Sequence, residues 1–148
     1  MSLLCIQKVL RRQLSTTCPH LYDWPRHPSV ASNCKVIEGE ASKLEPIVIV
    51  HGMLGSSTNW MSLARIMQKR TRRAVLIPDL RNHGLSPHHE SHTYFDMASD
   101  IRRLCADRGL SDVTLVAHSM GARAAMLLCL LGTILLDVLK LLSLIGTR

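Results

Sequence analysis

Ser119 is the residue of this chain best placed to act as a nucleophile. It lies in Val116-Ala117-His118-Ser119-Met120-Gly121, between a β-branched run and a helical pattern, with small residues two positions before and after it. This arrangement is typical of a sharp strand-to-helix turn that lifts a serine hydroxyl above a sheet. The helix that follows aims backbone N–H groups at developing negative charge. Ala117 stands where glycine is usual, and a serine that only caps the helix is the alternative interpretation.

A glycine-punctuated loop earlier in the chain is the second candidate for chemistry. His51-Gly52-Met53-Leu54-Gly55 directly follows the apolar run at 47–50. Such a loop can offer a backbone N–H to an oxyanion, and we expect the N–H groups of Met53 and Met120 to form the pair of donors. A plain glycine turn is the alternative for this loop alone. The two segments together favour a site for acyl transfer.

Three short apolar runs must position these loops. The runs at 47–50 and 74–79 are typical of buried strands, and the run at 113–117 is a third predicted strand. Apolar residues at helical spacing follow the first two runs, and a helical pattern starts just after Ser119. This alternation predicts an α/β fold with a parallel sheet flanked by helices. Sites in such sheets form at the carboxyl ends of the strands, where the candidate loops lie.

Three segments, residues 51–60, 79–88 and 118–128, resemble the α/β-hydrolase family. The resemblance covers roughly residues 45–130. It implies a partial α/β-hydrolase fold and hydrolysis of lipid or acyl esters in mitochondria, with the matrix as the expected compartment. By the same resemblance Ser119 is the nucleophile, and neither a metal nor an organic cofactor is needed.

The chain departs from the family around and after the serine. Ala117 and Ala122 replace glycines, and we expect these small side chains to be tolerated. The family's acid and histidine follow the serine in chain order, whereas all eight histidines here precede Ser119. His51 and His83, on loops at the expected edge of the sheet, are the candidates for a substitute base.

Two aspartates could be taken for the missing acid. Asp79 ends the second predicted strand and is expected to anchor its own loop. Asp137 follows the serine but lies in an apolar helical stretch. Because no histidine stands in the expected place, we expect this chain to be catalytically impaired.

Composition limits the alternatives. The 148 residues are 47% hydrophobic and 20% charged, which suits one globular core and excludes a disordered chain. The net charge of +7 permits anionic partners without indicating one. Five scattered cysteines form no C-x-x-C pair, which argues against a disulfide framework or zinc knuckle and favours a reducing compartment.

The sequence divides into four parts. Residues 1–19 are basic and acid-free and end in hydroxyl residues, which predicts a mitochondrial presequence, with a plain tail or a secretory signal as alternatives. Residues 20–45 are a predicted linker with one strand around Lys35–Ile37. Residues 46–131 form the N-terminal half of the predicted hydrolase core. Residues 132–148 are a divergent Leu-rich tail, expected to be a shortened or alternatively spliced ending.

Other constellations indicate no further site. Asp137 and Lys140 in the tail argue against a stable transmembrane span. The histidines of 88–92 lack a metal-binding spacing and follow a proline, which predicts a surface loop and no metal. The basic residues of 65–73 fall near a helix end without an aromatic platform, so we expect no nucleic-acid binding.

The combined prediction is a serine ester hydrolase of the carboxylesterase or lipase type. Its partner would be a small-molecule ester or an acyl lipid. The alternative is a non-catalytic isoform that binds lipid or the full-length enzyme through its open sheet and Leu-rich tail. Association with a full-length homologue or another mitochondrial enzyme belongs to that alternative.

Overall fold

The computed structural model describes residues 28–40 and 44–130. The predicted presequence at 1–19 and the Leu-rich tail at 132–148 lie outside the described residues. Within them, no helix is long and apolar enough to cross a bilayer.

A four-stranded sheet forms the centre of the molecule. The strands are β1 (Cys34–Ile37), β2 (Ile47–Val50), β3 (Val75–Pro78) and β4 (Thr114–Ala117), in the spatial order β1-β3-β2-β4. β2 pairs in parallel with both β3 and β4, as the alternating pattern predicts. The strand expected near Lys35–Ile37 is β1, and it lies antiparallel to β3 at one edge. The fold class is therefore α/β, with a mostly parallel sheet.

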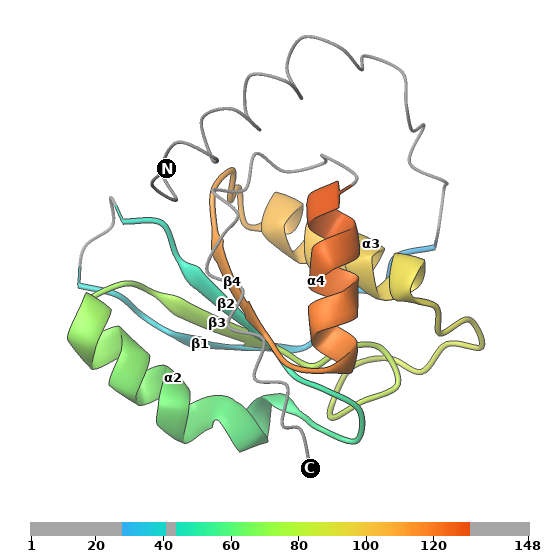
Figure 1. The fold of residues 1–148 in the computed structure, drawn as a ribbon, viewed down its shortest axis with the longest axis horizontal. Helices are drawn as coiled ribbons and strands as arrows, with labels where there is room; N and C mark the ends of the chain where they lie inside the picture. Colours follow the sequence, from blue (N-terminus) through green and yellow to red (C-terminus); the bar gives the residue numbers. More distant parts are fainter. Residues whose placement is uncertain (1–27, 41–43, 131–148) are drawn as a thin grey trace, which may run out of the picture.

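Helices cover both faces of this sheet. α2 (Ser57–Thr71) lies against one face, and α3 (Tyr94–Asp107) and α4 (Met120–Leu130) lie together on the other (Figure 1). The isoleucines and valines of β2 alternate between the two layers, with Ile47 and Ile49 in the α2 layer and Val48 and Val50 in the other. All four side chains of β2 are buried, which explains why this strand is an unbroken β-branched run.

Polar capping residues mark the starts of α2 and α3. Ser56 is the N-cap of α2. Thr93 is the N-cap of α3, where its side chain accepts a hydrogen bond from the Asp96 N–H in a capping box. The side chain of Leu63 in α2 is apolar but 40% exposed. The core on this side depends instead on Ala64, with Trp60 and Met67 packed around it.

The parallel arrangement brings three loops to one edge. Val50 at the end of β2 is in register with Ala117 at the end of β4, and β3 is parallel to both strands. The loops that begin at His51, Asp79 and His118 therefore leave the sheet at the same edge.

Candidate active site

The turn between β4 and α4 holds Ser119 in a strained conformation. Its φ is 50°, in the left-handed region that side chains other than glycine rarely adopt. The side chain is exposed at the edge of the sheet. No N–H of α4 donates to Ser119 Oγ among the described residues, so the serine does not act as a capping side chain. A strained, exposed serine at a strand-to-helix turn is the local structure that a nucleophile requires.

Close backbone contact explains the small residues around the serine. A Cβ added at Gly121 would lie 2.3 Å from the carbonyl oxygen of His51 and 2.8 Å from Val50 Cγ1. The helix therefore starts directly against the end of β2, and only glycine fits at that position. Ala117 is buried within β4, where its methyl group is accommodated.

The loop after β2 rests on the neighbour of the serine. A Cβ added at Gly52 would lie 2.6 Å from His118 Nδ1, so glycine lets the loop pack against this ring. The His118 ring also lies 6.1 Å, between centroids, from the Trp60 ring of α2. The His118 N–H donates to the Val50 carbonyl oxygen at 3.0 Å. His118 thus links the serine turn to the Gly52 loop.

Two backbone N–H groups at this edge have no acceptor. Neither the Met53 N–H nor the Met120 N–H donates a hydrogen bond within the described residues. Met120 is the first residue of α4, and the first N–H groups of a helix have no intrahelical partner. Both residues line the same pocket. Both N–H groups are therefore candidate donors to an anionic oxygen.

His51 is fully buried and both of its ring nitrogens are occupied. Its Nε2 accepts from the Leu80 N–H at 3.0 Å, so Nδ1 carries the proton and donates to the Gly52 carbonyl oxygen at 2.8 Å. Burial lowers the pKa of His51, and the hydrogen bond to Gly52 opposes that shift only in part. The ring is a neutral brace between two loops, with no lone pair left to accept a proton from Ser119.

His83 differs from His51 in having a ring nitrogen to spare. Its Nδ1 lies 2.9 Å from the Arg81 carbonyl oxygen, which can only accept, so Nδ1 carries the proton and Nε2 the lone pair. The ring lies 5.1 Å from the His51 ring and 5.6 Å from the His92 ring, between centroids. His83 lines the pocket beside Met53 and Met120, but it makes no hydrogen bond to Ser119.

Asp79 anchors its own loop, as its place at the end of a strand suggests. One carboxylate oxygen accepts from the Ser57 N–H at 2.6 Å, and the other accepts from Asn33 Nδ2 at 2.9 Å and the Leu85 N–H at 3.0 Å. Burial alone would raise the pKa of Asp79, but these hydrogen bonds outweigh it and hold the pKa below its usual value. Within residues 28–40 and 44–130, no histidine forms a hydrogen bond with this carboxylate, so it does not orient a base there.

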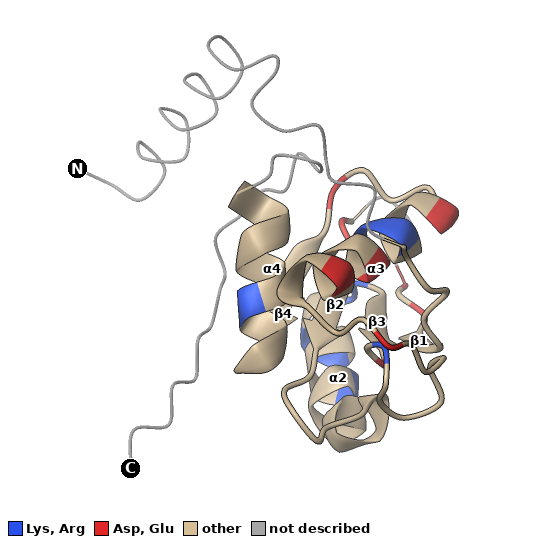
Figure 2. Ribbon diagram, turned by 90° about the vertical axis from the view of Figure 1, so that its right-hand side faces the viewer, with Lys and Arg blue, Asp and Glu red and all other residues tan. Residues whose placement is uncertain are grey.

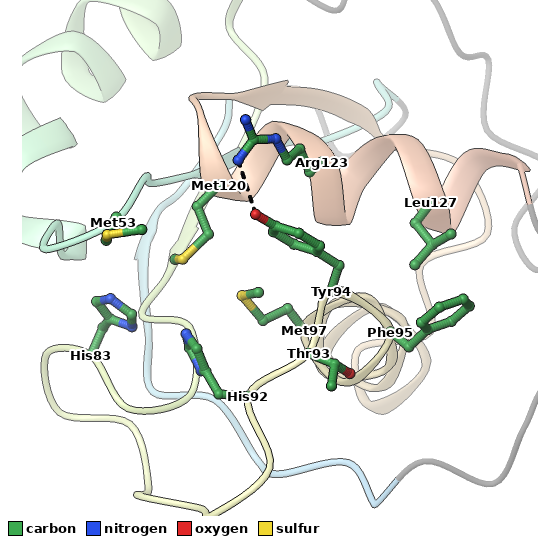
Figure 3. Close-up of a pocket in the computed structure, with 10 residues that line it drawn as sticks. All are labelled: Met53, His83, His92, Thr93, Tyr94, Phe95, Met97, Met120, Arg123 and Leu127. Carbon is green, nitrogen blue, oxygen red and sulfur yellow. Dashed lines mark hydrogen bonds between the residues drawn. The ribbon is translucent and has the colours of Figure 1, made fainter.

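A pocket of about 590 Å³ opens next to the serine turn, between the start of α4, the start of α3 and the loops after β2 and β3 (Figure 3). Beyond Met53, Met120 and His83, its lining includes residues that sequence reasoning missed: His92, Thr93, Tyr94, Phe95, Met97, Arg123 and Leu127. Arg123 and Leu127 follow Ser119 at four-residue intervals on one face of α4. That spacing is the sequence signal that could have identified them.

The described part of the chain shows no metal centre. No group of three or more His, Cys, Asp or Glu residues in it is arranged to hold a metal ion. The histidine-rich stretch at 88–92 lies in a loop, where the His89 carbonyl oxygen and N–H both bond the Asn82 side chain.

Comparison with known proteins gives consistent matches. The family described as alpha/beta hydrolase fold matches residues 45–137. The chain is 47% identical over 95 residues to the sn-1-specific diacylglycerol lipase ABHD11 of Mus musculus, covering 64% of this chain and 31% of that protein. It is 37% identical over 94 residues to a probable alcohol acetyltransferase of Saccharomyces cerevisiae, covering 62% and 28%. The chain thus spans under a third of the length of these curated relatives.

Solved structures agree on the fold. A marine microorganism esterase superposes with a TM-score of 0.66 and 32% identity, over 72% of this chain and 39% of that one. An esterase from Exiguobacterium antarcticum superposes with a TM-score of 0.60 and 24% identity, over 67% and 35%.

Proposed function

The chain belongs to the alpha/beta hydrolase family, and we propose that its edge loops form a serine site for cleaving acyl esters. One observation carries the proposal. Ser119, strained and exposed, directly precedes Met120, which lines a largely apolar pocket together with Met53, and the N–H groups of both methionines are uncommitted within the described residues. Acyl transfer requires a nucleophile, donors for the oxyanion and a space that binds the acyl group.

The chemistry divides into two steps. Ser119 Oγ attacks the acyl carbon and loses its proton, and the carbonyl oxygen becomes an oxyanion held by the Met53 and Met120 N–H groups. The tetrahedral intermediate collapses, the bond to the alcohol oxygen breaks, and the alcohol leaves with the proton. Water then attacks the acyl-serine, releasing the carboxylic acid and restoring the hydroxyl.

An acyl lipid ester is the substrate class we propose. The walls of the pocket include Met53, Met97, Phe95, Met120 and Leu127, which suit a hydrocarbon chain. Several relatives, including the mouse protein, are named diacylglycerol lipases, which supports the same class. The pocket and Ser119 occupy the same edge of the sheet, so a chain bound in one would place its ester near the other.

We further propose that the 148-residue chain works slowly by itself. Ser119 Oγ has no hydrogen-bond partner within the described residues, and the ring nitrogens of His51 are both occupied. Without a base on Oγ, what remains is oxyanion binding and proximity, which sustain rates about 10³–10⁴-fold above the uncatalysed reaction. His83, with a lone pair on Nε2, is the candidate for residual assistance.

A fluorophosphonate probe, which reacts with activated serines, tests the proposal. We expect slow labelling of the purified folded chain that is lost in Ser119→Ala and kept in Ser62→Ala, a matched change at an exposed serine of α2. The hydrolysis of p-nitrophenyl butyrate should show the same dependence. If His83 assists, His83→Gln lowers both rates.

Three results would count against the proposal. Labelling that persists in Ser119→Ala would exclude this serine as the nucleophile. Hydrolysis at the rate of a complete triad enzyme would refute the impairment. The absence of any labelling of a folded chain would leave a second candidate function, the binding of an acyl lipid without turnover. The lack of a hydrogen-bond partner for Ser119 Oγ within the described part of the chain favours this second function.

A further inference from the structure

Arg123 is a cation at the rim of the pocket. It lies in the first turn of α4, one turn after Ser119, and its backbone N–H donates to the Ser119 carbonyl oxygen at 3.2 Å. The guanidinium lies 5.8 Å from the centre of the Tyr94 ring, and its Nη1 donates to the Tyr94 hydroxyl at 2.9 Å. Figure 3 shows this hydrogen bond between the start of α4 and the start of α3.

The stability of α4 does not explain the positive charge of Arg123. The partial positive charge at a helix N-terminus opposes a cation in the first turn. The first turn of α4 carries no acidic residue, and α4 shows a basic band but no acidic one (Figure 2). Within the described residues, no carboxylate forms an ion pair with Arg123. Tyr94 holds the guanidinium in place but leaves its charge unneutralised.

The pocket supplies the rest of a binding site. Arg123 lines it together with the apolar side chains of Met97, Met120 and Leu127. A cation beside an apolar wall fits a ligand with a hydrocarbon chain and an anionic group. Arg123 is exposed at this rim, so its guanidinium is open to an incoming anion, while the apolar walls offer a surface for the hydrocarbon chain.

We propose that Arg123 selects acyl ligands that carry a negatively charged oxygen group, a carboxylate or a phosphate. This proposal names the substrate class of the esterase site proposed above, and it rests on that proposed function. Binding of such a ligand does not need turnover. Tyr94 acts as the positioning residue, because its hydroxyl fixes the direction of the guanidinium.

Equilibrium binding tests this selectivity without relying on catalysis. The fluorescent fatty acid cis-parinaric acid and its methyl ester are titrated into the full chain at pH 8. We expect the acid to bind about tenfold more tightly than the ester, the effect of one charge-assisted hydrogen bond. Arg123→Gln should abolish the difference, and Arg123→Lys should keep most of it.

The control variant is Arg65→Gln, which removes the same charge from an exposed position of α2, on the opposite face of the sheet. It should leave the preference for the acid unchanged. Competition by dodecanoate, dodecyl phosphate and dodecanol then identifies the charged group, since both anions should displace the probe better than the alcohol. A melting curve for each variant confirms that it is folded.

Several outcomes would overturn the proposal. These are equal binding of acid and ester by the wild type, a preference that survives in Arg123→Gln, or an equal loss in Arg65→Gln. Failure of both probes to bind would exclude the pocket as a site for amphiphiles. None of these results bears on Ser119 labelling, so the failure of this inference can be told apart from failure of the proposed site.

Discussion

His51 shows how burial changes the role of a residue that sequence alone makes a catalytic candidate. The ring is fully buried, accepts from Leu80 and donates to Gly52, so it joins the loop after β2 to the loop after β3. Protonating Nε2 would break the bond from Leu80 and place a charge in the core. The folded protein therefore needs a neutral imidazole at this position.

This neutrality predicts a pH dependence of stability. Because burial holds the pKa of His51 below the ordinary value of about 6.5, the unfolded chain takes up a proton before the folded chain does. The free energy of unfolding should fall as the pH drops below about 6.5, by up to about 1.4 kcal/mol per pH unit, until the lowered pKa is reached. Urea denaturation at pH 7.5 and 5.5 measures this change. His51→Gln should show a smaller difference between the two pH values, and an equal difference would contradict the assignment.

At the level of elements, the loop after β3 is held in shape by a single carboxylate. Asp79 accepts hydrogen bonds from Ser57 at the start of α2, from Asn33 ahead of β1 and from Leu85 within the loop. Gly84 approaches this carboxylate with a φ of 54°, and a Cβ there would lie 2.3 Å from Asp79 Cγ. The conformation that carries His83 to the pocket thus depends on this close contact.

Two glycine substitutions separate the contact from backbone strain. Gly84→Ala should lower the free energy of unfolding through both the left-handed backbone and the clash with Asp79. Gly109→Ala is the matched control, because its φ is 63° and an added Cβ meets nothing within 4 Å. We expect the control to cost about 1 kcal/mol. Gly84→Ala should cost about 1–3 kcal/mol more in urea denaturation. Equal costs would show that the loop relaxes around the methyl group.

At the scale of the whole molecule, a buried ion pair joins segments that are far apart in the chain. Arg81 donates to both carboxylate oxygens of Asp100 on α3, at 2.7 and 2.8 Å, and both side chains are fully buried. The guanidinium also donates to the Pro28 carbonyl oxygen, and Asp100 accepts from the Val30 N–H at 2.7 Å. This salt bridge therefore joins three parts of the chain, namely the segment before β1, the loop that follows β3, and helix α3.

Two Asp-to-Asn changes in α3 test the importance of that junction. Asp100→Asn removes the carboxylate that accepts two bonds from buried Arg81 and leaves only the longer 3.7 Å pair with Asp96. It should lower the free energy of unfolding by about 3 kcal/mol. Asp107→Asn removes an exposed pair with Arg103 on the same helix and should cost less than about 1 kcal/mol. Thermal or urea denaturation compares the two variants. A similar small cost for both would mean that water or a neighbouring group replaces the lost charge.

The sequence by itself determined the features that depend on near neighbours. The β-branched runs predicted β2, β3 and β4. The small residues around Ser119 predicted its turn, because a tight turn is a local requirement of the backbone. The residues of the two loops predicted the oxyanion roles of Met53 and Met120, which stay predictions, and the family resemblance added the hydrolase fold. The presequence and the tail also stay predictions, since they lie outside the described residues.

Only the tertiary structure decided which distant groups meet. His51 accepts from an N–H 29 residues away, and the Arg81–Asp100 pair bonds residues that precede it by 53 and 70 positions. Arg123 faces Tyr94 across the gap between two helices. Neither the periodicity nor the turn pattern around these residues specifies their partners, because side-chain contacts depend on how the helices pack on the sheet. The sequence alone did not distinguish His51 from His83 as a candidate base. The strand pairing and the burial of the two loops make His51 a structural residue with both ring nitrogens bonded, whereas His83 keeps a lone pair on Nε2.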